Sequence, residues 1–173
     1  PSYERFEVDV INVSADTDRR REGFLRLAFG GATDGYFCIA YGPRNRDPKK
    51  FREEFFQYPN QIPQALDLIN EVYQGHNVWV CPQLFSRRRR RKEDVLLTPS
   101  AWADLDTCEP ENLFLEPTMV IESSPGRYQA LWLFEHPVDP DDAENISQRI
   151  AYTHAEDGCD RSGWDLTQLL RFP

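Results

Sequence analysis

The sequence lacks features that mark several large classes of protein. No apolar run approaches the roughly 18 residues that cross a bilayer, and there is no signal peptide. No segment is repeated along the chain. These absences argue against a membrane-spanning or secreted protein, and we expect a soluble protein of the cytoplasm with no membrane partner.

Cysteine and histidine are also scarce. The four cysteines are widely scattered without a C-x-x-C pair, and there are only three histidines. A zinc site would need the histidines to converge from distant segments, so buried free thiols are the simpler expectation and a convergent zinc site is the alternative. The residues concerned are Cys38, Cys81, Cys108 and Cys159, with His76, His136 and His154.

The chain has enough apolar material for a folded domain. Its 173 residues are 40% hydrophobic and 13% aromatic, which is typical of a globular protein and not of a disordered one. That length suits one well-packed domain, with room for two lobes. The chain begins with Pro1 and stops at Pro173, and we expect both ends to be cut from a longer polypeptide.

The charge is acidic overall but very uneven. The formal net charge is −9, whereas nucleic-acid-binding proteins usually carry a basic patch because phosphate neutralisation drives their affinity. Six positive charges follow one another at residues 87–92, so the rest of the chain is near −15. A local basic patch is compatible with that total. The run Arg87, Arg88, Arg89, Arg90 and Arg91 is either a phosphate-binding segment or a mobile, self-repelling loop.

Hydrophobic periodicity predicts a mixture of strands and helices. Strands are expected at residues 6–13, 24–29, 36–41, 78–81, 118–122 and 127–134 and around the acidic pair described next, and helices at 62–73, 139–154 and 166–170. Asp139 and Pro140 open the second helix as N-cap and first helical residue, and Asp165 is expected to cap the third. Because strands and helices do not alternate regularly, the pattern favours a two-layer α/β domain over a doubly wound one.

The most informative motif is the pair Asp104 and Asp106 in the strand-like run S-A-W-A-D-L-D. Alternate side chains of a strand share a face, so the two carboxylates are expected on one side, roughly 7 Å apart. That arrangement suits two divalent cations that clamp a phosphoryl transfer. The plain alternative is the solvated face of an edge strand.

Two further motifs follow. The turn in E-S-S-P-G-R-Y-Q-A-L-W offers hydroxyls and backbone N–H groups to a phosphate, and Arg127 and Gln129 share a face beyond it. The alternative is an ordinary hairpin whose Gly126 only satisfies the turn. The last motif is D-R-S-G-W-D-L-T-Q-L-L-R-F-P, in which Asp165 is a possible third metal-binding acid and Arg171 a cation near a triphosphate. Their alternatives are a helix cap and a surface arginine.

In this order, the three motifs resemble those of the archaeo-eukaryotic primase superfamily, in particular its phage- and plasmid-encoded primase-polymerase branch. The resemblance covers roughly residues 77–173. It implies an α+β, two-lobed core with an RRM-like mixed or antiparallel sheet flanked by helices. The N-terminal α/β lobe would then cover residues 1–76 and the catalytic lobe residues 77–173.

The resemblance also implies roles for residues. Asp104, Asp106 and Asp165 match the acids that bind catalytic Mg²⁺ or Mn²⁺. The second motif matches the part that holds the nucleotide's phosphates, here Ser123, Ser124, Gly126, Arg127, Tyr128 and Gln129, with Arg171 from the third. Many relatives have histidine in the second motif, where this chain offers Tyr128 or Gln129, and we favour Gln129. The last motif is incomplete because the chain ends at Pro173.

The implied function is that of a DNA primase-polymerase, which makes and extends primers by template-directed nucleotidyl transfer. Its partners would be a single-stranded DNA template, NTP or dNTP, and a helicase or other replication domain. Template contacts are expected from the arginine run and from Trp79 stacked on bases. Two rival interpretations are a non-catalytic replication-initiator module and another D-x-D metal enzyme, such as a nuclease or a nucleotide-sugar transferase.

Overall fold

The computed structural model describes residues 15–45 and 47–173. Within that range the chain forms two antiparallel sheets and three α-helices, joined by loops with three short 3₁₀ helices. In chain order the elements are α1 (Ala15–Ala28), β1 (Tyr36–Pro43), η1 (Pro48–Lys50), β2 (Arg52–Gln57), α2 (Ile62–Val72), β3 (His76–Val80), η2 (Lys92–Asp94), β4 (Thr98–Asp106), η3 (Pro110–Asn112), β5 (Met119–Ser124), β6 (Arg127–Val138), α3 (Pro140–Thr153) and β7 (Leu170–Arg171).

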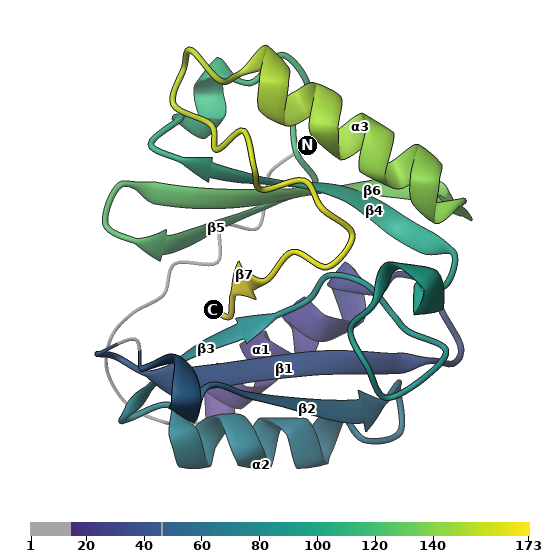
Figure 1. Ribbon diagram of the computed structural model, residues 1–173, viewed down its shortest axis with the longest axis vertical. Helices are drawn as coiled ribbons and strands as arrows, with labels where there is room; N and C mark the ends of the chain where they lie inside the picture. The colour runs from purple at the N-terminus through teal and green to yellow at the C-terminus, as the bar shows by residue number, and fades with distance from the viewer. Residues whose placement is uncertain (1–14, 46) are drawn as a thin grey trace.

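The two sheets lie one above the other (Figure 1). One has four strands in the order β2-β1-β3-β7, and the other has three in the order β4-β6-β5. Helix α2 packs on the larger sheet, where its buried side chains join the main core, and α3 covers the outer side of the smaller sheet. The mixed α and β content with antiparallel sheets confirms the predicted fold class.

Helix α2 forms where the spacing of apolar residues predicts it. Its buried side chains recur every three or four residues and therefore line one face, and a proline stands in its first turn. The buried residues are Ile62, Ala65, Leu66, Ile69 and Val72. They join the main core together with residues of α1, β1 and β3.

Helix α3 confirms a second prediction. The Asp139 side chain accepts a hydrogen bond from the Asp141 N–H, 3.0 Å away, and caps the helix as expected. Small residues on the buried face of α3 let it pack closely on the three-stranded sheet. One of them, Ser147, is buried, and its hydroxyl oxygen accepts a hydrogen bond from the Trp102 backbone N–H at 3.0 Å.

Strand β4 has two buried faces, which explains its nearly continuous apolar sequence. Ala101, Ala103 and Leu105 face α3, where they form a second apolar cluster. Trp102 points the other way, into the main core between the sheets. Asp104 continues this alternation near the end of the strand, and Asp106 follows after a shift of register.

Some expectations about local structure are wrong. Residues 24–28 form the end of α1 and Phe29 the turn after it, not a strand, because Phe24, Leu25, Ala28 and Phe29 are buried with helical spacing. Residues 166–169 form a turn and an irregular segment that lead into β7, not a helix, and Leu170 already belongs to β7, which pairs with β3. Strand β2 was not predicted. The strand expected at residues 6–13 lies outside the described residues.

The larger sheet draws on distant parts of the sequence. Strands β3 and β7 follow residue 75, yet both belong to the sheet whose first strand is β1. The last residues of the chain therefore lie against the first sheet. None of the described helices is long and apolar enough to cross a membrane. All four cysteines are buried thiols outside any disulfide, as predicted.

Candidate active site

Asp104 and Asp106 stand at the end of β4, where the regular pairing with β6 breaks. Asp104 is opposite Gln129 and Asp106 is opposite Tyr128, with a register shift between the two acids. Asp106 has a φ of +50°, a left-handed conformation that is uncommon outside glycine and that clusters at functional sites. Its N–H donates to the Asp104 carboxylate at 3.3 Å. The positive φ of Asp106 and this hydrogen bond together hold the two acids close to each other.

Asp104 lies in an environment that disfavours its charged form. Burial raises the pKa of Asp104, and the nearby carboxylates of Asp160 and Asp106 raise it further. Hydrogen bonds from the Asp106 N–H and the Gln129 side chain act in the opposite direction without cancelling the shift. A half-buried carboxylate crowded by like charges is a common feature of functional sites.

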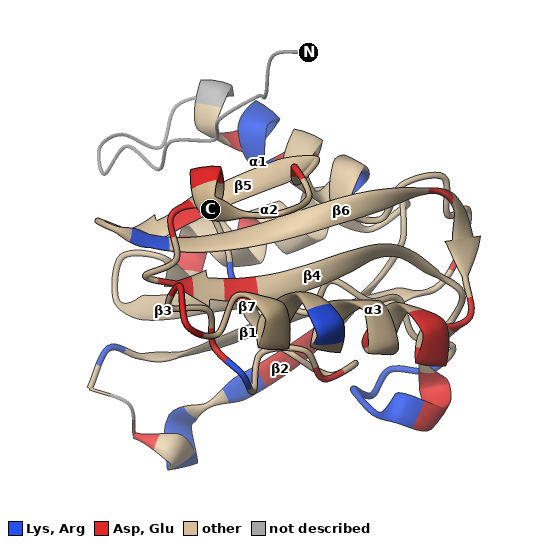
Figure 2. Ribbon diagram, turned by 90° about the horizontal axis from the view of Figure 1, so that it is seen from above, with Lys and Arg blue, Asp and Glu red and all other residues tan. Residues whose placement is uncertain are grey.

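Arg127, the first residue of β6, forms an ion pair with Asp106. Both side chains are about half exposed, at 48% and 49%. Figure 2 shows the basic start of β6 beside the acidic end of β4. As predicted from the strand alternation, Arg127 and Gln129 fall on alternate positions of the same strand.

Gln129 connects the acidic pair to the end of the chain. Its side chain is buried, hydrogen-bonds to Asp104, and accepts the backbone N–H of Arg171 at 2.8 Å. Arg171 lies in β7 opposite Trp79 of β3, and its guanidinium lies over the Trp79 ring, 5.1 Å from the centroid. The first, second and third motifs therefore meet here, although they are far apart in the sequence.

Asp165 has other partners. Its Oδ2 accepts a salt bridge from Lys92 at 2.9 Å, and its Oδ1 accepts the Thr167 N–H at 2.7 Å. Burial alone would raise the pKa of Asp165, but the bonds from Thr167 and Lys92 outweigh it and lower the pKa. Among the described residues, the oxygens of Asp104, Asp106 and Asp165 do not all lie within 4.8 Å of one another. A role for Asp165 as third ligand stays a prediction.

The β5–β6 hairpin carries the remaining residues of the second motif. Gly126 has a φ of +69°, and its N–H donates to Glu122 Oε1 at 3.0 Å. The Ser123 hydroxyl donates to the Arg127 carbonyl, and Ser124 is exposed. Tyr128 packs against the cluster under α3, on the opposite face of the sheet from Gln129. That placement favours Gln129 over Tyr128 as the residue directed toward the acids.

The arginine run is divided between half-buried and exposed side chains. Arg89 pairs with Asp94, and Arg90 pairs with Glu53 and donates to the Thr167 carbonyl. These two arginines therefore tie the loop to its own end and to β2. Arg87, Arg88 and Arg91 are exposed. Arg87 and Arg91 make long ion pairs of 3.7 Å with Asp94 and Glu93 at the end of the loop.

Sequence reasoning missed three contributors to the site. Asp160 donates its N–H to the Asp104 carbonyl at 2.9 Å and places its carboxylate near that of Asp104. Gly163 packs so closely that a Cβ there would lie 2.8 Å from the Asp104 Cβ. Lys92 was counted only as part of a basic run. Nothing in local sequence periodicity reveals these contacts, because each depends on tertiary packing.

Comparisons with known proteins give a consistent result. The family model of the RepB DNA-primase N-terminal domain matches residues 75–173. The crystal structure of the catalytic domain of primase RepB′ in complex with initiator DNA is similar, with a TM-score of 0.63 and 16% identity over 90% of this chain and 75% of that chain. The crystal structure of primase RepB′ has a TM-score of 0.60 and 17% identity over 90% of this chain and 49% of that one. No curated protein sequence matches.

Proposed function

The chain belongs to the RepB DNA-primase N-terminal domain family, and from that premise we propose that it is a DNA primase-polymerase. It synthesises primers on single-stranded DNA and extends them by metal-dependent nucleotidyl transfer. One observation carries the proposal: an acidic pair at the end of β4 lies beside Arg127 of β6 and beside Gln129, which accepts the backbone N–H of Arg171 in β7.

The acids at the end of β4 fit the metals that such a reaction uses. Mg²⁺ and Mn²⁺ prefer carboxylate oxygens, and the carboxylates of Asp104, Asp106 and Asp160 crowd one another in a half-buried place. A divalent cation relieves that crowding. When bound, such ions lower the pKa of an attacking hydroxyl and neutralise charge on a triphosphate.

The proposed ligands are Asp104 and Asp106, with Asp165 as the third. For Asp165 to join them, its salt bridge to Lys92 has to open, because Lys92 holds one carboxylate oxygen. Lys92 has a second acceptor in Glu144, at 2.7 Å, so it keeps a partner when Asp165 leaves.

Arg127 and Arg171 are the proposed phosphate contacts. Arg127 is half exposed and borders the acids through Asp106, so it can reach a phosphate bound at the acidic pair. Gln129 is already bonded to both Asp104 and the Arg171 backbone, and we assign it the role of holding these two groups in register. Ser123, Ser124 and Gly126 complete the proposed nucleotide-binding turn.

The proposed partners are a single-stranded DNA template and NTP or dNTP, with a helicase or other replication domain. One structural neighbour was crystallised with initiator DNA, which supports DNA as the template. Exposed Arg87, Arg88 and Arg91 are the proposed template contacts.

The test is incorporation of labelled nucleotide on a single-stranded template with Mg²⁺ or Mn²⁺. The double substitution Asp104→Asn with Asp106→Asn keeps the side-chain volumes and is expected to bring synthesis below detection. The matched control is Asp141→Asn with Asp142→Asn, which changes two exposed acids in the first turn of α3. Its activity is expected to equal that of the wild type.

Circular dichroism and thermal unfolding show whether both double variants are folded. Synthesis at the wild-type level by the folded Asp104/Asp106 variant would refute the assignment of the acids. Absence of any incorporation by the wild-type chain, with template binding intact, would instead identify a non-catalytic initiator module.

A further inference from the structure

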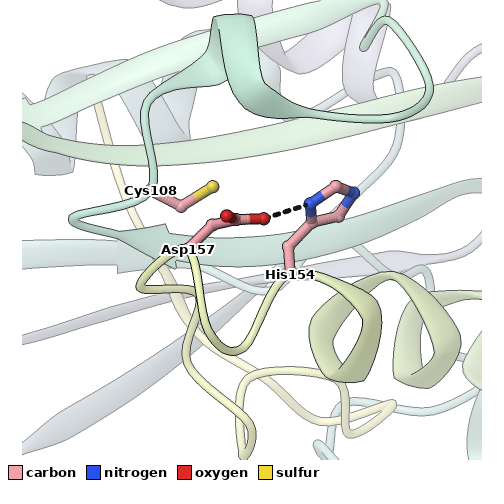
Figure 3. A group of neighbouring side chains, drawn as sticks. All are labelled: Cys108, His154 and Asp157. Atoms are coloured by element: carbon pink, nitrogen blue, oxygen red, sulfur yellow. Dashed lines mark hydrogen bonds and ion pairs between the residues drawn. The ribbon is translucent and has the colours of Figure 1, made fainter.

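A second group of potential metal ligands lies on the far side of the three-stranded sheet. Figure 3 shows Cys108, just after β4, together with His154 at the C-terminal end of α3 and Asp157 in the following loop. One ligand atom from each lies within 4.8 Å of the other two. No other group of three such side chains occurs among the residues that the structure describes.

The fold holds these side chains together through their backbones. Gly158 has a φ of +108°, and a Cβ added there would lie 3.1 Å from the Cys108 nitrogen. The loop after α3 is therefore packed directly on the loop after β4. Cys108 is fully buried and His154 is 7% exposed, whereas the Asp157 side chain is 45% exposed and leaves one side open to an incoming ion.

We propose that Cys108, His154 and Asp157 bind a Zn²⁺ ion. One sulfur, one imidazole nitrogen and one carboxylate oxygen are donors that zinc accepts in tetrahedral sites, whereas Mg²⁺ and Mn²⁺ favour oxygen alone. His154 Nδ1 and Asp157 Oδ2 are 3.0 Å apart, close to the edge of a zinc tetrahedron with bonds of about 2 Å. A water molecule completes the coordination.

Binding has a definite consequence for His154. Its Nε2 accepts the Phe114 N–H at 3.1 Å, so the ring proton is on Nδ1, where it faces Asp157. An ion on Nδ1 displaces that proton and moves the ring N–H to Nε2, opposite the Phe114 N–H. The Phe114 peptide then has to turn away. The Phe114 side chain is 90% exposed, so no buried contact of its ring opposes this rotation of the peptide.

The ion would brace the backbone behind the acidic pair. Cys108 follows Asp106 by two residues, and Cys159, two residues after Asp157, donates its thiol to the Asp104 carbonyl at 3.3 Å. Because the Cys159 sulfur is not among the ligand atoms that lie within 4.8 Å of one another, the proposal gives Cys159 no ligand role. Zinc would thus join the two loops that end beside Asp104 without touching nucleotide.

The test uses the full chain after treatment with a chelator. Co²⁺ is titrated in excess Mg²⁺, which occupies sites made of oxygen alone, and Zn²⁺ then displaces the Co²⁺. We expect one Co²⁺ per chain, tetrahedral d–d bands, and a near-ultraviolet charge-transfer band from a single thiolate. Cys108→Ala is expected to abolish the charge-transfer band. Cys38→Ala, which removes a buried thiol from a separate cluster, is expected to keep it.

Asp157→Asn is the second variant, and it is expected to fold because its side chain is exposed. Loss of a ligand should weaken zinc binding by at least about tenfold, the effect of losing even an outer partner. Absence of the thiolate band in the wild type, or equal zinc affinity in Asp157→Asn, would overturn the proposal. The Asp104→Asn, Asp106→Asn variant is expected to bind zinc like the wild type, so the outcome is independent of primase activity.

Discussion

Gly163 is the position at which one added methyl group should disturb the proposed active site most directly. An alanine Cβ would lie 2.8 Å from the Asp104 Cβ and 3.4 Å from the Asp104 nitrogen. Ordinary carbon–carbon contacts are about 3.5–4.0 Å, so one backbone has to move by roughly 0.7 Å or more. The Asp104 backbone cannot shift easily, because β4 is paired with β6 and the Asp104 carbonyl accepts the Asp160 N–H.

Overpacking of this kind costs about 1–3 kcal/mol. For a chain of this length, each kcal/mol lowers the melting temperature by about 2–4 °C, so Gly163→Ala is expected to lower it by about 2–12 °C. Thermal unfolding followed by circular dichroism measures the change. Gly75→Ala is the control, because a Cβ at Gly75 meets nothing within 4 Å. Its melting temperature should differ by far less.

Primer synthesis provides a second reading of the same substitution. Misplacing a reacting group by about 1 Å can cost on the order of 100-fold in rate, so Gly163→Ala should lose activity even at temperatures where it is folded. A melting temperature equal to that of Gly75→Ala, with unchanged synthesis, would refute the claim that Gly163 sets the position of Asp104.

Four further predictions follow from the described contacts. Gly23→Ala, in the exposed middle of α1 with nothing within 4 Å of its Cβ, should stabilise the fold by about 0.5–1 kcal/mol in urea unfolding. Asp139→Ala removes the cap of α3 and should cost about 0.5–2 kcal/mol in the same assay. The pKa of Asp104 is raised in the folded state, so its charge destabilises the fold at neutral pH. Asp104→Asn should therefore raise the melting temperature near about pH 7. This gain should vanish as the pH falls through the raised pKa. The pKa of Asp165 is lowered in the folded state, so Asp165→Asn should lower the melting temperature near about pH 7, and this loss should fade below about pH 4. A change of the same sign in the Asp104→Asn and Asp165→Asn variants would contradict this account.

Elements with strong local signals could be predicted from the sequence. The apolar spacing from Ile62 and the Asp139–Pro140 start are local features, and both helices formed as expected. The prediction of a strand at Phe24 was wrong because a short apolar segment fits the spacing of a helix as well as that of a strand. The segment at Leu166 misled because pairing of β7 with β3 is a tertiary event.

The candidate site was predictable only in its parts. The spacing of Asp104 and Asp106 placed them together, and the motif order indicated that Gln129 and Arg171 belong with them. What sequence could not reveal is which acid lies next to Asp104. The nearby carboxylate is that of Asp160, whereas Asp165 is held by Lys92, a residue more than 70 positions earlier in the chain.

Arg171 links the three motifs, which are far apart in the sequence. Its backbone pairs with β3 of the larger sheet, while its N–H donates to Gln129 of the smaller sheet. The next residue, Phe172, is buried and donates its N–H to the Val78 carbonyl of β3 at 3.0 Å, and this bond holds β7 against β3. The position of Arg171 relative to the acids is therefore set by how the two sheets stack. Because Gln129 bonds to both Arg171 and Asp104, we expect a change in that stacking to shift the acidic pair, so the proposed chemistry would depend on the alignment of the sheets as well as on the residues themselves.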